Sequence, residues 1–410
     1  MAGRVWQMVA RDTPDNACRT APMEGESNPH YNGGKMMRIA LDARKMTRTD
    51  SGIGAYTLNL ARALLEEDKD IELLLICDTT RRQRRLQSSR VEEVIFPFSP
   101  LTPLTQFALG PWLRRQRFDV FHAPFDVVPR GLHRPLVVTI HDLNWLVNTR
   151  YNSHNLGVRL VAGAFYRFSL AAALREASRI LAVSHATRHA IVEHTPWNAG
   201  KVRVAYNGID RSRIYPVETE VAYRTLTHLI APGTPFVLTV GQGSPYKNHL
   251  NAVRGFLTAF GSRPEYRMIL VRRSLARDKE LQTLLRSPQA RAQVLCLPYV
   301  SPDVLNALYN AARMVLHPSY YEGFGLPLIE AMAVGTPLVT ASVSAMPEVA
   351  GPAALCVSPA DYRAIAEALL SLDRDEAVRQ RLIAAGHRQL ERFSWSTCAQ
   401  ATLAVYRELV

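Results

Sequence analysis

The stretch His317-Pro-Ser-Tyr-Tyr-Glu-Gly-Phe-Gly-Leu-Pro-Leu-Ile-Glu330 decides the interpretation of this chain, because it holds two carboxylates that one continuous helix cannot carry. The two glycines between them are poor helix residues, and Pro327 lacks the amide donor of a helix interior. Glu322 is therefore predicted to lie in a loop. Proline is favoured in a first helical turn, so residues 326–334 are predicted to form a short helix with Glu330 about one turn in. The loop lets both carboxylates face one small ligand.

The loop before this helix is suited to an anion. A helix N-terminus favours negative charge, and glycines leave backbone N–H groups accessible. A phosphate could bind there while the carboxylates accept hydrogen bonds from hydroxyl groups. A ligand that has both phosphate and neighbouring hydroxyls is a nucleotide-sugar. A strand-loop-helix with a capping Glu and tight-turn glycines explains the local pattern equally well. The amides in question belong to Gly323, Phe324, Gly325 and Leu326.

The spacing of Glu322 and Glu330 resembles the E-x7-E motif of glycosyltransferase family 4, the retaining enzymes with the GT-B fold. The similarity continues through Thr340-Ala-Ser-Val-Ser-Ala-Met-Pro-Glu-Val-Ala-Gly351 and extends over most of the chain, from about Met37 to Arg407. The resemblance implies two Rossmann-like domains facing each other across a cleft. It also implies retaining transfer of a hexosyl unit, mannose favoured, from a nucleotide-diphosphate sugar to a lipid-linked saccharide or glycan acceptor in polysaccharide biosynthesis. GDP-mannose is the favoured donor.

Length and periodicity agree with an α/β protein of more than one domain. The chain has 410 residues, of which 47% are apolar, enough to fill two cores. Short apolar runs alternate with helix-like stretches, which predicts parallel sheets covered on both faces. The expected strands of the first half are 37–42, 71–77, 94–98, 119–121, 136–140, 180–183 and 202–205. The first 35 residues are expected to be a disordered extension. The resemblance further implies an acceptor-side domain over 36–214, a donor domain over 215–393 and a returning helix over 394–410.

Composition excludes several classes. No apolar run approaches the length of a membrane span, and the first 35 residues lack the apolar core of a signal peptide. Five scattered cysteines argue against a disulfide framework and suit the cytoplasm. Two D-x-D tripeptides, at 68–70 and 373–375, are interpreted as solvated charge, so no metal and no cofactor is expected.

The segment Ser51-Gly-Ile-Gly-Ala-Tyr56 follows the first expected strand. A strand, a glycine-containing turn and a helix to about Glu67 make a plausible phosphate-facing element. Structural turn glycines explain the pattern equally well. The segment also resembles the family loop that approaches donor phosphates and acceptor, which implies a donor contact at Gly52 and Gly54 and an acceptor contact at Tyr56.

Two histidines follow apolar runs of the first half. His122 and His141 each stand just past an expected strand, where open α/β sheets bind ligands. Hydrogen bonding to a neighbouring loop is the alternative for either one. Both fit acceptor-domain patterns of the family, and His141 is the preferred candidate for touching the transferred sugar.

A second series of strands begins at Phe236-Val-Leu-Thr-Val-Gly241. The residues that follow resemble the family's diphosphate clamp, in which Lys247 supplies positive charge to the leaving group. Gln242 stands where many members carry Arg, and Arg272 where relatives often have glycine. Arg272 could add a phosphate contact or be a solvated strand-end arginine. Val300 lies in the loop whose backbone recognises the base in relatives.

The net charge of +13 indicates an anionic partner. Basic clusters at 81–85 and 114–117 flank the apolar-rich segment 96–112, which suits an anionic membrane surface at the inner face of the membrane. No nucleic-acid motif accompanies the charge, so no nucleic-acid partner is expected. Solvated helix faces remain the alternative.

The resemblance assigns roles within one site. Glu330 would bind the ribose hydroxyls, Glu322 the sugar, and Lys247 the diphosphate, with Glu322, Lys247 and His141 as the catalytic group. Two other hypotheses remain open. One is an epimerase or phosphorylase of the same fold, and the other is a non-catalytic nucleotide-sugar-binding subunit, suggested by the departures at Gln242 and Arg272.

Overall fold

The computed structural model describes residues 36–46, 52–78, 86–147, 155–272 and 278–410. The extension expected over 1–35, the basic cluster at 81–85 and Ser51 lie outside the described residues. All that follows concerns the described residues.

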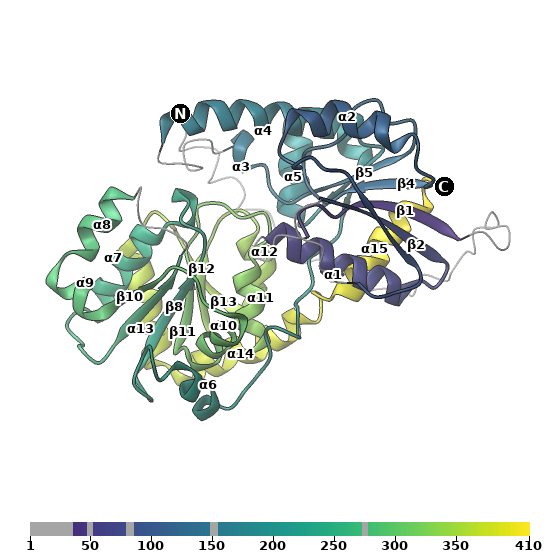
Figure 1. Cartoon of the computed structure of the whole chain (residues 1–410). Coiled ribbons are helices and arrows are strands. Elements are labelled where there is room, and N and C mark those ends of the chain that lie inside the picture. The colour runs from purple at the N-terminus through teal and green to yellow at the C-terminus, as the bar shows by residue number, and fades with distance from the viewer. Residues whose placement is uncertain (1–35, 47–51, 79–85, 148–154, 273–277) are drawn as a thin grey trace. The chain divides into compact units, whose positions relative to one another are not determined.

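The described strands form two parallel sheets, so the α/β prediction is confirmed (Figure 1). The first sheet has the order β3-β2-β1-β4-β5-β6-β7 and the second the order β10-β9-β8-β11-β12-β13. The first sheet comprises β1 (Met37–Asp42), β2 (Ile71–Cys77), β3 (Val91–Ile95), β4 (Val120–Ala123), β5 (Leu136–Ile140), β6 (Arg179–Ala182) and β7 (Val202–Val204). The second comprises β8 (Phe236–Val240), β9 (Arg267–Val271), β10 (Val294–Leu297), β11 (Met314–His317), β12 (Leu338–Ala341) and β13 (Ala354–Val357).

Described helices lie between most successive strands, as is usual for the crossover connections that parallel pairing requires. Those among the first seven strands are α1 (Gly52–Glu67), α2 (Pro103–Leu113), α3 (Asn144–Val147), α4 (Leu156–Glu176) and α5 (His185–His194), with the 3₁₀ turn η2 (Pro196–Lys201). Between the sheets and along the second lie α6 (Thr219–Leu226), η3 (Pro245–Lys247), α7 (His249–Phe260), α8 (Lys279–Leu285), α9 (Pro288–Gln293), α10 (Pro302–Ala311), α11 (Leu326–Ala333), α12 (Met346–Ala350) and η4 (Gly351–Ala353). The chain ends with α13 (Tyr362–Arg374), α14 (Glu376–Leu390) and α15 (Trp395–Arg407).

The inner strands of each sheet are buried on both faces, since successive side chains point to opposite sides of the sheet and both sides are covered. In β1, Ile39 and Leu41 pack with α1 and α15, whereas Ala40 packs on the other face with residues of α2 and α4. In β8, Leu238 and Val237 likewise belong to different clusters. The strands therefore read as continuous apolar runs rather than as alternating ones.

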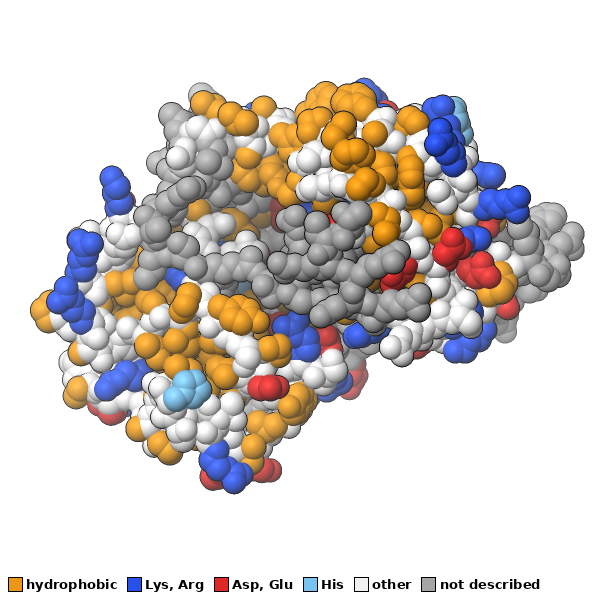
Figure 2. Space-filling model, viewed as in Figure 1, with side chains coloured by type: hydrophobic (Ala, Val, Ile, Leu, Met, Phe, Trp, Pro, Cys, Tyr) orange, Lys and Arg blue, Asp and Glu red, His pale blue; other side chains and the backbone are white. Residues whose placement is uncertain are grey.

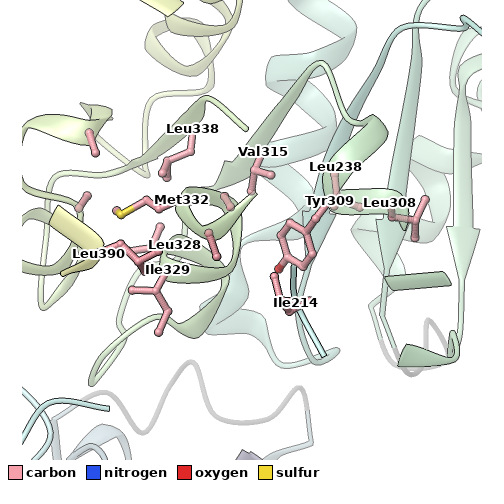
Figure 3. Packing of buried hydrophobic residues seen from close by; sticks show 14 of the residues in the cluster. Ile214, Leu238, Leu308, Tyr309, Val315, Leu328, Ile329, Met332, Leu338 and Leu390 are labelled. Carbon is pink, nitrogen blue, oxygen red and sulfur yellow. The ribbon is translucent and has the colours of Figure 1, made fainter. Parts of the chain in front are cut away.

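The helix α11 is held by its apolar side. Leu328, Ile329 and Met332 are buried in one cluster with Leu338 and Leu390, and Figure 3 shows them pointing into that packing. The residues recur at spacings of one, three and four, so they form one face of the helix. This packing fixes the helix that carries Glu330.

The last helix, α15, packs against α1 beside the first sheet rather than against the second (Figure 1). Leu403 and Tyr406 of α15 are buried with Leu60 of α1. Among the described residues, no helix is both long and apolar enough to cross a membrane.

The strand order reverses direction at two places, between β1 and β4 and between β8 and β11. Segments leaving the carboxyl ends of two such strands turn to opposite faces and leave a crevice between them, where open α/β sheets bind ligands. The motifs predicted from the sequence follow strands at both places.

Candidate active site

A cavity of about 770 Å³ lies at the carboxyl ends of strands from both sheets. It receives residues from α1, the segment after β5 and the 207–214 segment on one side, and from the segments after β8, β9, β10 and β11 on the other. Of the predicted site residues, it brings together Gly52, Tyr56, His141, Gln242, Lys247, Val300, Glu322, Gly323, Phe324, Gly325, Leu326 and Glu330.

Lys247 and Glu322 both line this cavity and form an ion pair, with 2.6 Å between Nζ and Oε1. Lys247 ends η3 after β8, and Glu322 lies in the loop after β11, as predicted. Because β8 and β11 are paired neighbours, their carboxyl ends bring the two segments together. The same Oε1 atom also accepts hydrogen bonds from Ser319 Oγ at 2.7 Å and from His317 Nε2 at 3.0 Å.

This environment keeps Glu322 ionised. Burial alone would raise its pKa, but the Lys247 charge and the His317 hydrogen bond outweigh burial and hold the pKa well below its usual range. For Lys247, burial acts to lower the pKa, and the attraction of Glu322 outweighs it and raises the pKa. The pair is therefore a fixed carboxylate and a fixed ammonium facing a ligand cavity.

Glu330 is half-buried on α11 and also faces the cavity. Its Oε2 atom accepts a hydrogen bond from Tyr309 Oη at 2.6 Å. Burial raises the pKa of Glu330, and the hydrogen bond from Tyr309 opposes that shift. One carboxylate oxygen is thus oriented by α10, which leaves the other to accept ligand hydroxyls.

The glycine loop between the carboxylates is shaped by close contacts. Gly325 caps α11 with φ of 95°, a conformation that glycine adopts without strain. A Cβ atom on Gly323 would lie 1.6 Å from the carbonyl oxygen of His141. The carbonyl of Gly323 accepts hydrogen bonds from Ser184 Oγ at 2.6 Å and Thr187 Oγ1 at 3.1 Å. The loop is therefore held against the carboxyl ends of β5 and β6.

His141 faces the cavity from the end of β5. Its Nε2 donates a hydrogen bond to the Pro124 carbonyl at 3.0 Å, and its ring meets the Tyr56 ring edge-on at 4.7 Å. Burial lowers the pKa of His141 to about 4, so the imidazole is neutral near pH 7. With Nε2 protonated, Nδ1 carries the lone pair.

The acceptor-side contact predicted for His122 is not supported by its position. The strand β4 extends to Ala123, so His122 lies within it and not past its end. The side chain is fully buried, bonded to Thr139 Oγ1 at 2.8 Å and to the hydroxyl of Tyr406. Burial lowers the pKa of His122 to about 3. It is a neutral core residue that joins β4 and β5 to α15.

The glycine segment after β1 also differs from expectation. Gly52 and Gly54 do not lie in a loop before the helix. Both belong to the first helical turn of α1, which begins at Gly52. Gly52 lines the cavity, whereas Gly54 is buried and does not. The donor contact predicted for Gly54 is therefore not supported by its position. Tyr56 is buried, lines the cavity and bonds Thr139 Oγ1 at 3.1 Å.

Several cavity residues were not predicted from the sequence. Asp142 follows His141 and is exposed to the cavity; surrounding protein and the like charges of Asp126 and Glu322 raise its pKa to about 6. Asp210 and Arg213 enter from the segment after β7. Nothing in their local sequence distinguishes them from surface charges. The structure brings both close enough to Glu330 to affect its pKa, which Arg213 lowers and Asp210 raises.

Glu348 belongs to the stretch 340–351, which resembles the family motif, and it contacts the helix α5 beside the first sheet. Its two carboxylate oxygens accept hydrogen bonds from the backbone amides of His185 at 2.7 Å and Ala186 at 2.8 Å. It thereby caps the N-terminus of α5. Tyr206 donates a third hydrogen bond at 2.9 Å.

No group of three or more His, Cys, Asp or Glu side chains in the described part of the chain is arranged to hold a metal ion. The second D-x-D tripeptide is not solvated as expected, since Asp373 accepts hydrogen bonds from Arg263 at 2.6 Å and from Tyr266. Its carboxylate joins α13 to the segment before β9.

Comparison with known proteins agrees with this geometry. The family described as "Glycosyl transferases group 1" matches residues 227–389, and that described as "Glycosyltransferase Family 4" matches residues 51–213. The O-antigen chain mannosyltransferase B of Escherichia coli is 31% identical over 393 residues, covering 91% of this chain and all of that protein. A D-inositol 3-phosphate glycosyltransferase of Streptomyces avermitilis is 32% identical over 241 residues, covering 56% of this chain and 52% of that protein.

Solved structures share the fold. Sucrose-phosphate synthase from Thermosynechococcus elongatus superposes with a TM-score of 0.73 at 21% identity, covering 91% of this chain and 99% of that one. The lipopolysaccharide glycosyltransferase WaaG superposes with a TM-score of 0.71 at 14% identity, covering 90% and 99%. Two parallel Rossmann-like sheets with a cavity at their carboxyl ends define the GT-B class. The chain belongs to glycosyltransferase family 4 and is a glycosyltransferase.

Proposed function

We propose that this protein is a retaining mannosyltransferase that acts on a lipid-linked saccharide during O-antigen or related polysaccharide assembly. The observation that carries the proposal is the 31% identity along the whole length of the E. coli O-antigen chain mannosyltransferase B. Similarity to a second O-antigen chain mannosyltransferase, from Salmonella typhimurium, supports it, at 24% identity over 281 residues.

The cavity has the chemistry that a nucleotide-sugar donor needs. Lys247 offers positive charge to the diphosphate, and the amides at the start of α11 offer hydrogen bonds to it. The outward oxygen of Glu330 suits the ribose hydroxyls, since Tyr309 fixes the other oxygen. Glu322, held ionised, suits the sugar hydroxyls. Val300 lies where backbone groups could contact the base. GDP-mannose is the proposed donor.

Transfer with retention follows from positioning. An acceptor hydroxyl oxygen forms the new bond to the anomeric carbon on the face from which the diphosphate leaves. The bond from that carbon to the diphosphate oxygen breaks, and the acceptor proton passes to the departing phosphate. Lys247 stabilises the charge left on the diphosphate, and Glu322 and His141 position the sugar. We propose that the reaction needs no metal ion or other cofactor and takes place at the cytoplasmic face of the membrane.

The test combines binding with transfer. Unfolding midpoints are measured with GDP-mannose, UDP-glucose and UDP-N-acetylglucosamine for the wild type and Glu330→Gln. A ligand that binds only the folded state raises the midpoint. We expect a shift with GDP-mannose that the variant reduces. Mannosyl transfer to a lipid-linked saccharide in the presence of EDTA, with NMR of the product anomer, tests metal independence and retention.

Three results would contradict the proposal. Donor binding without any glycoside product would favour a binding subunit, and donor isomerisation or phosphorolysis would favour the other GT-B reactions. A larger rise of the unfolding midpoint with a UDP-sugar than with GDP-mannose would show that the transferred unit is that sugar and not mannose.

We also propose an anionic membrane as a partner of one surface. Exposed apolar side chains gather over α2 and α4 in Figure 2, and we call them the α2–α4 apolar patch: Leu104, Phe107, Leu160, Val161 and Phe168. Gln106 of α2 donates to Ser169 Oγ of α4 at 2.8 Å, which holds the two helices together. Arg130 stacks on the rings of Phe168 at 4.4 Å and Phe107 at 5.5 Å.

Basic residues stand beside this patch. Arg114, Arg115 and Arg117 follow α2 directly and are exposed. Apolar side chains can enter the interface of a bilayer while adjacent arginines pair with lipid phosphates. The combination of apolar and cationic groups fits an anionic bilayer better than a neutral one.

Sedimentation with vesicles tests the membrane proposal. We expect the wild type to bind vesicles rich in phosphatidylglycerol and not pure phosphatidylcholine, and Phe107→Asp to bind roughly tenfold less, since a charge replaces an inserted ring. Trp197→Asp is the matched control, because Trp197 is 73% exposed but lies outside the patch. Equal losses in both variants, or equal binding to both vesicles, would contradict the proposal.

A further inference from the structure

The segments after β8 and β9 form one wall of the cavity. The two strands are paired neighbours, so their carboxyl ends lie side by side. The amide of Gly241 donates to the Val271 carbonyl at 3.0 Å, and the Arg272 guanidinium donates to the Gly243 carbonyl at 3.2 Å. These bonds tie the segment that leads to Lys247 to the one that begins at Arg272.

Arg272 is fixed and buried although it borders the cavity. Arg272 is only 3% exposed, and its Nη1 atom forms an ion pair with Asp278 Oδ2 at 3.2 Å. A solvated strand-end arginine, one of the two alternatives left by the sequence, is therefore excluded. Guanidinium stays charged at all accessible pH values, and a buried one is costly unless it is paired. A permanent cation is thus positioned at the cavity wall.

His249 provides a second and independent observation. It is 4% exposed, and neither ring nitrogen has a hydrogen-bond partner within the described part of the chain. Gly241, which lines the cavity, packs directly against this ring, because a Cβ on Gly241 would lie 3.1 Å from His249 Nε2 and 3.3 Å from Lys247 Cδ. Buried polar side chains normally have partners. The unpartnered ring nitrogens of His249 therefore point to a ligand that would supply a hydrogen-bond partner.

Charge and protonation at this wall fit an anion. Burial, together with the charges of Arg272 and Lys247, holds the pKa of His249 well below its usual range. The imidazole is neutral and can donate one N–H. His249 is also the first residue of α7, whose N-terminus carries partial positive charge. Gln242, which lines the same wall, adds no charge.

We propose that Arg272 is the second cation of a diphosphate subsite, with Lys247 as the first and His249 as a hydrogen-bond donor behind Gly241. The inference rests on the proposed function, since the diphosphate is that of the nucleotide-sugar donor. Both cations attract the diphosphate of the bound donor and oppose the negative charge that grows on it as the sugar leaves.

Calorimetric titration of the full chain tests the subsite. The probes are GDP, UDP and inorganic pyrophosphate, and the variants are Arg272→Gln, Arg272→Lys and the control Arg254→Gln, an exposed arginine of α7. We expect Arg272→Gln to weaken the binding of pyrophosphate and of the preferred nucleotide by about 10- to 100-fold, the worth of a charged hydrogen bond. Arg272→Lys should lose less, and the control should be unchanged.

A second substitution separates charge from folding. Because Gln242 lines the same wall, Gln242→Arg added to Arg272→Gln should restore at least tenfold of the lost affinity. Unfolding midpoints without ligand monitor the effect of leaving Asp278 without its partner. A lowered midpoint with unchanged affinity would show that Arg272 is only structural and overturn the inference.

The probes distinguish the two proposals. Wild-type protein that binds pyrophosphate through Arg272 but no nucleotide-sugar would overturn the proposed function and leave the subsite standing. Wild-type protein that binds a nucleoside diphosphate with equal affinity in Arg272→Gln would overturn the subsite alone. Protein that binds none of the probes would overturn both.

Discussion

The carbonyl oxygen of His141 occupies the place where a side chain of Gly323 would begin, only 1.6 Å from a Cβ built there. The end of β5 and the loop before α11 therefore meet with nothing between their backbones. Ser184 and Thr187 hold the same glycine by its carbonyl. The contact sets the distance between the residues proposed to bind the sugar, His141 and Glu322.

Gly323→Ala should separate these two segments. The backbone cannot absorb so short a contact, and a misplacement of about 1 Å can cost 100-fold in rate. We expect turnover to fall by about 10- to 100-fold while the protein remains folded. Steady-state kinetics and circular dichroism measure the two effects. Gly200→Ala is the control, since a Cβ there meets nothing within 4 Å; an active Gly323→Ala enzyme would refute the tight contact.

Glu322→Gln should lower stability in a manner that depends on pH. The folded pKa of Glu322 lies below its ordinary value of 4.5, so its contribution is present above pH 4.5 and is lost as the pH falls through the folded value. Breaking a buried pair leaves Lys247 without its partner, at a cost of about 3 kcal/mol. Denaturant unfolding should show this difference at pH 7 and a smaller one at pH 3. Glu66→Gln, at an exposed position, should show no such trend.

Asp142→Asn should stabilise the protein above pH 6 and not below pH 4. The folded pKa of about 6 exceeds the ordinary value of 3.8, because the surrounding protein displaces water and the charges of Asp126 and Glu322 oppose ionisation. The ionised form therefore weakens folding as the pH rises through this window. Asparagine keeps an oxygen for the Asn144 amide, which lies 2.8 Å from Asp142 Oδ1. Unfolding midpoints at pH 4 and pH 7.5 check the sign; a variant less stable at pH 7.5 would contradict it.

His122→Ala and His141→Ala should have opposite signatures. Loss of His122 removes two buried hydrogen bonds and leaves a void, so we expect about 2–4 kcal/mol of destabilisation with donor KM unchanged. Loss of His141 should reduce kcat by roughly tenfold or more with a smaller change in stability, since His141 lines the cavity. Kinetics and unfolding of both variants decide the assignment. A changed donor KM in His122→Ala would restore it as a site residue.

Much of the fold could be predicted from the sequence. Apolar runs of strand length separated by helical periodicity require a parallel sheet, and every expected strand of the first half has an observed counterpart. The loop at Glu322 and the short helix from Leu326 followed from glycine and proline chemistry alone. These features depend on backbone preferences within a few residues.

The errors in the predicted site arise where a shift of one or two residues in the end of a strand or helix changes the environment of a side chain. Extending β4 by two residues turned His122 from a loop residue into a core residue. Beginning α1 at Gly52 placed Gly54 inside a helix. Strand and helix ends are set by packing and pairing with neighbours, which local sequence does not contain.

The sequence by itself determined the two-sheet α/β class, the loop that presents Glu322 and the helix that presents Glu330, because these follow from local conformational preference and apolar periodicity. The tertiary structure decided which charges meet. Lys247 reaches Glu322 across 75 positions of sequence, and Arg272 lies buried beside the segment that leads to Lys247. Such pairs depend on strand order, since parallel neighbours carry distant segments to one edge of a sheet.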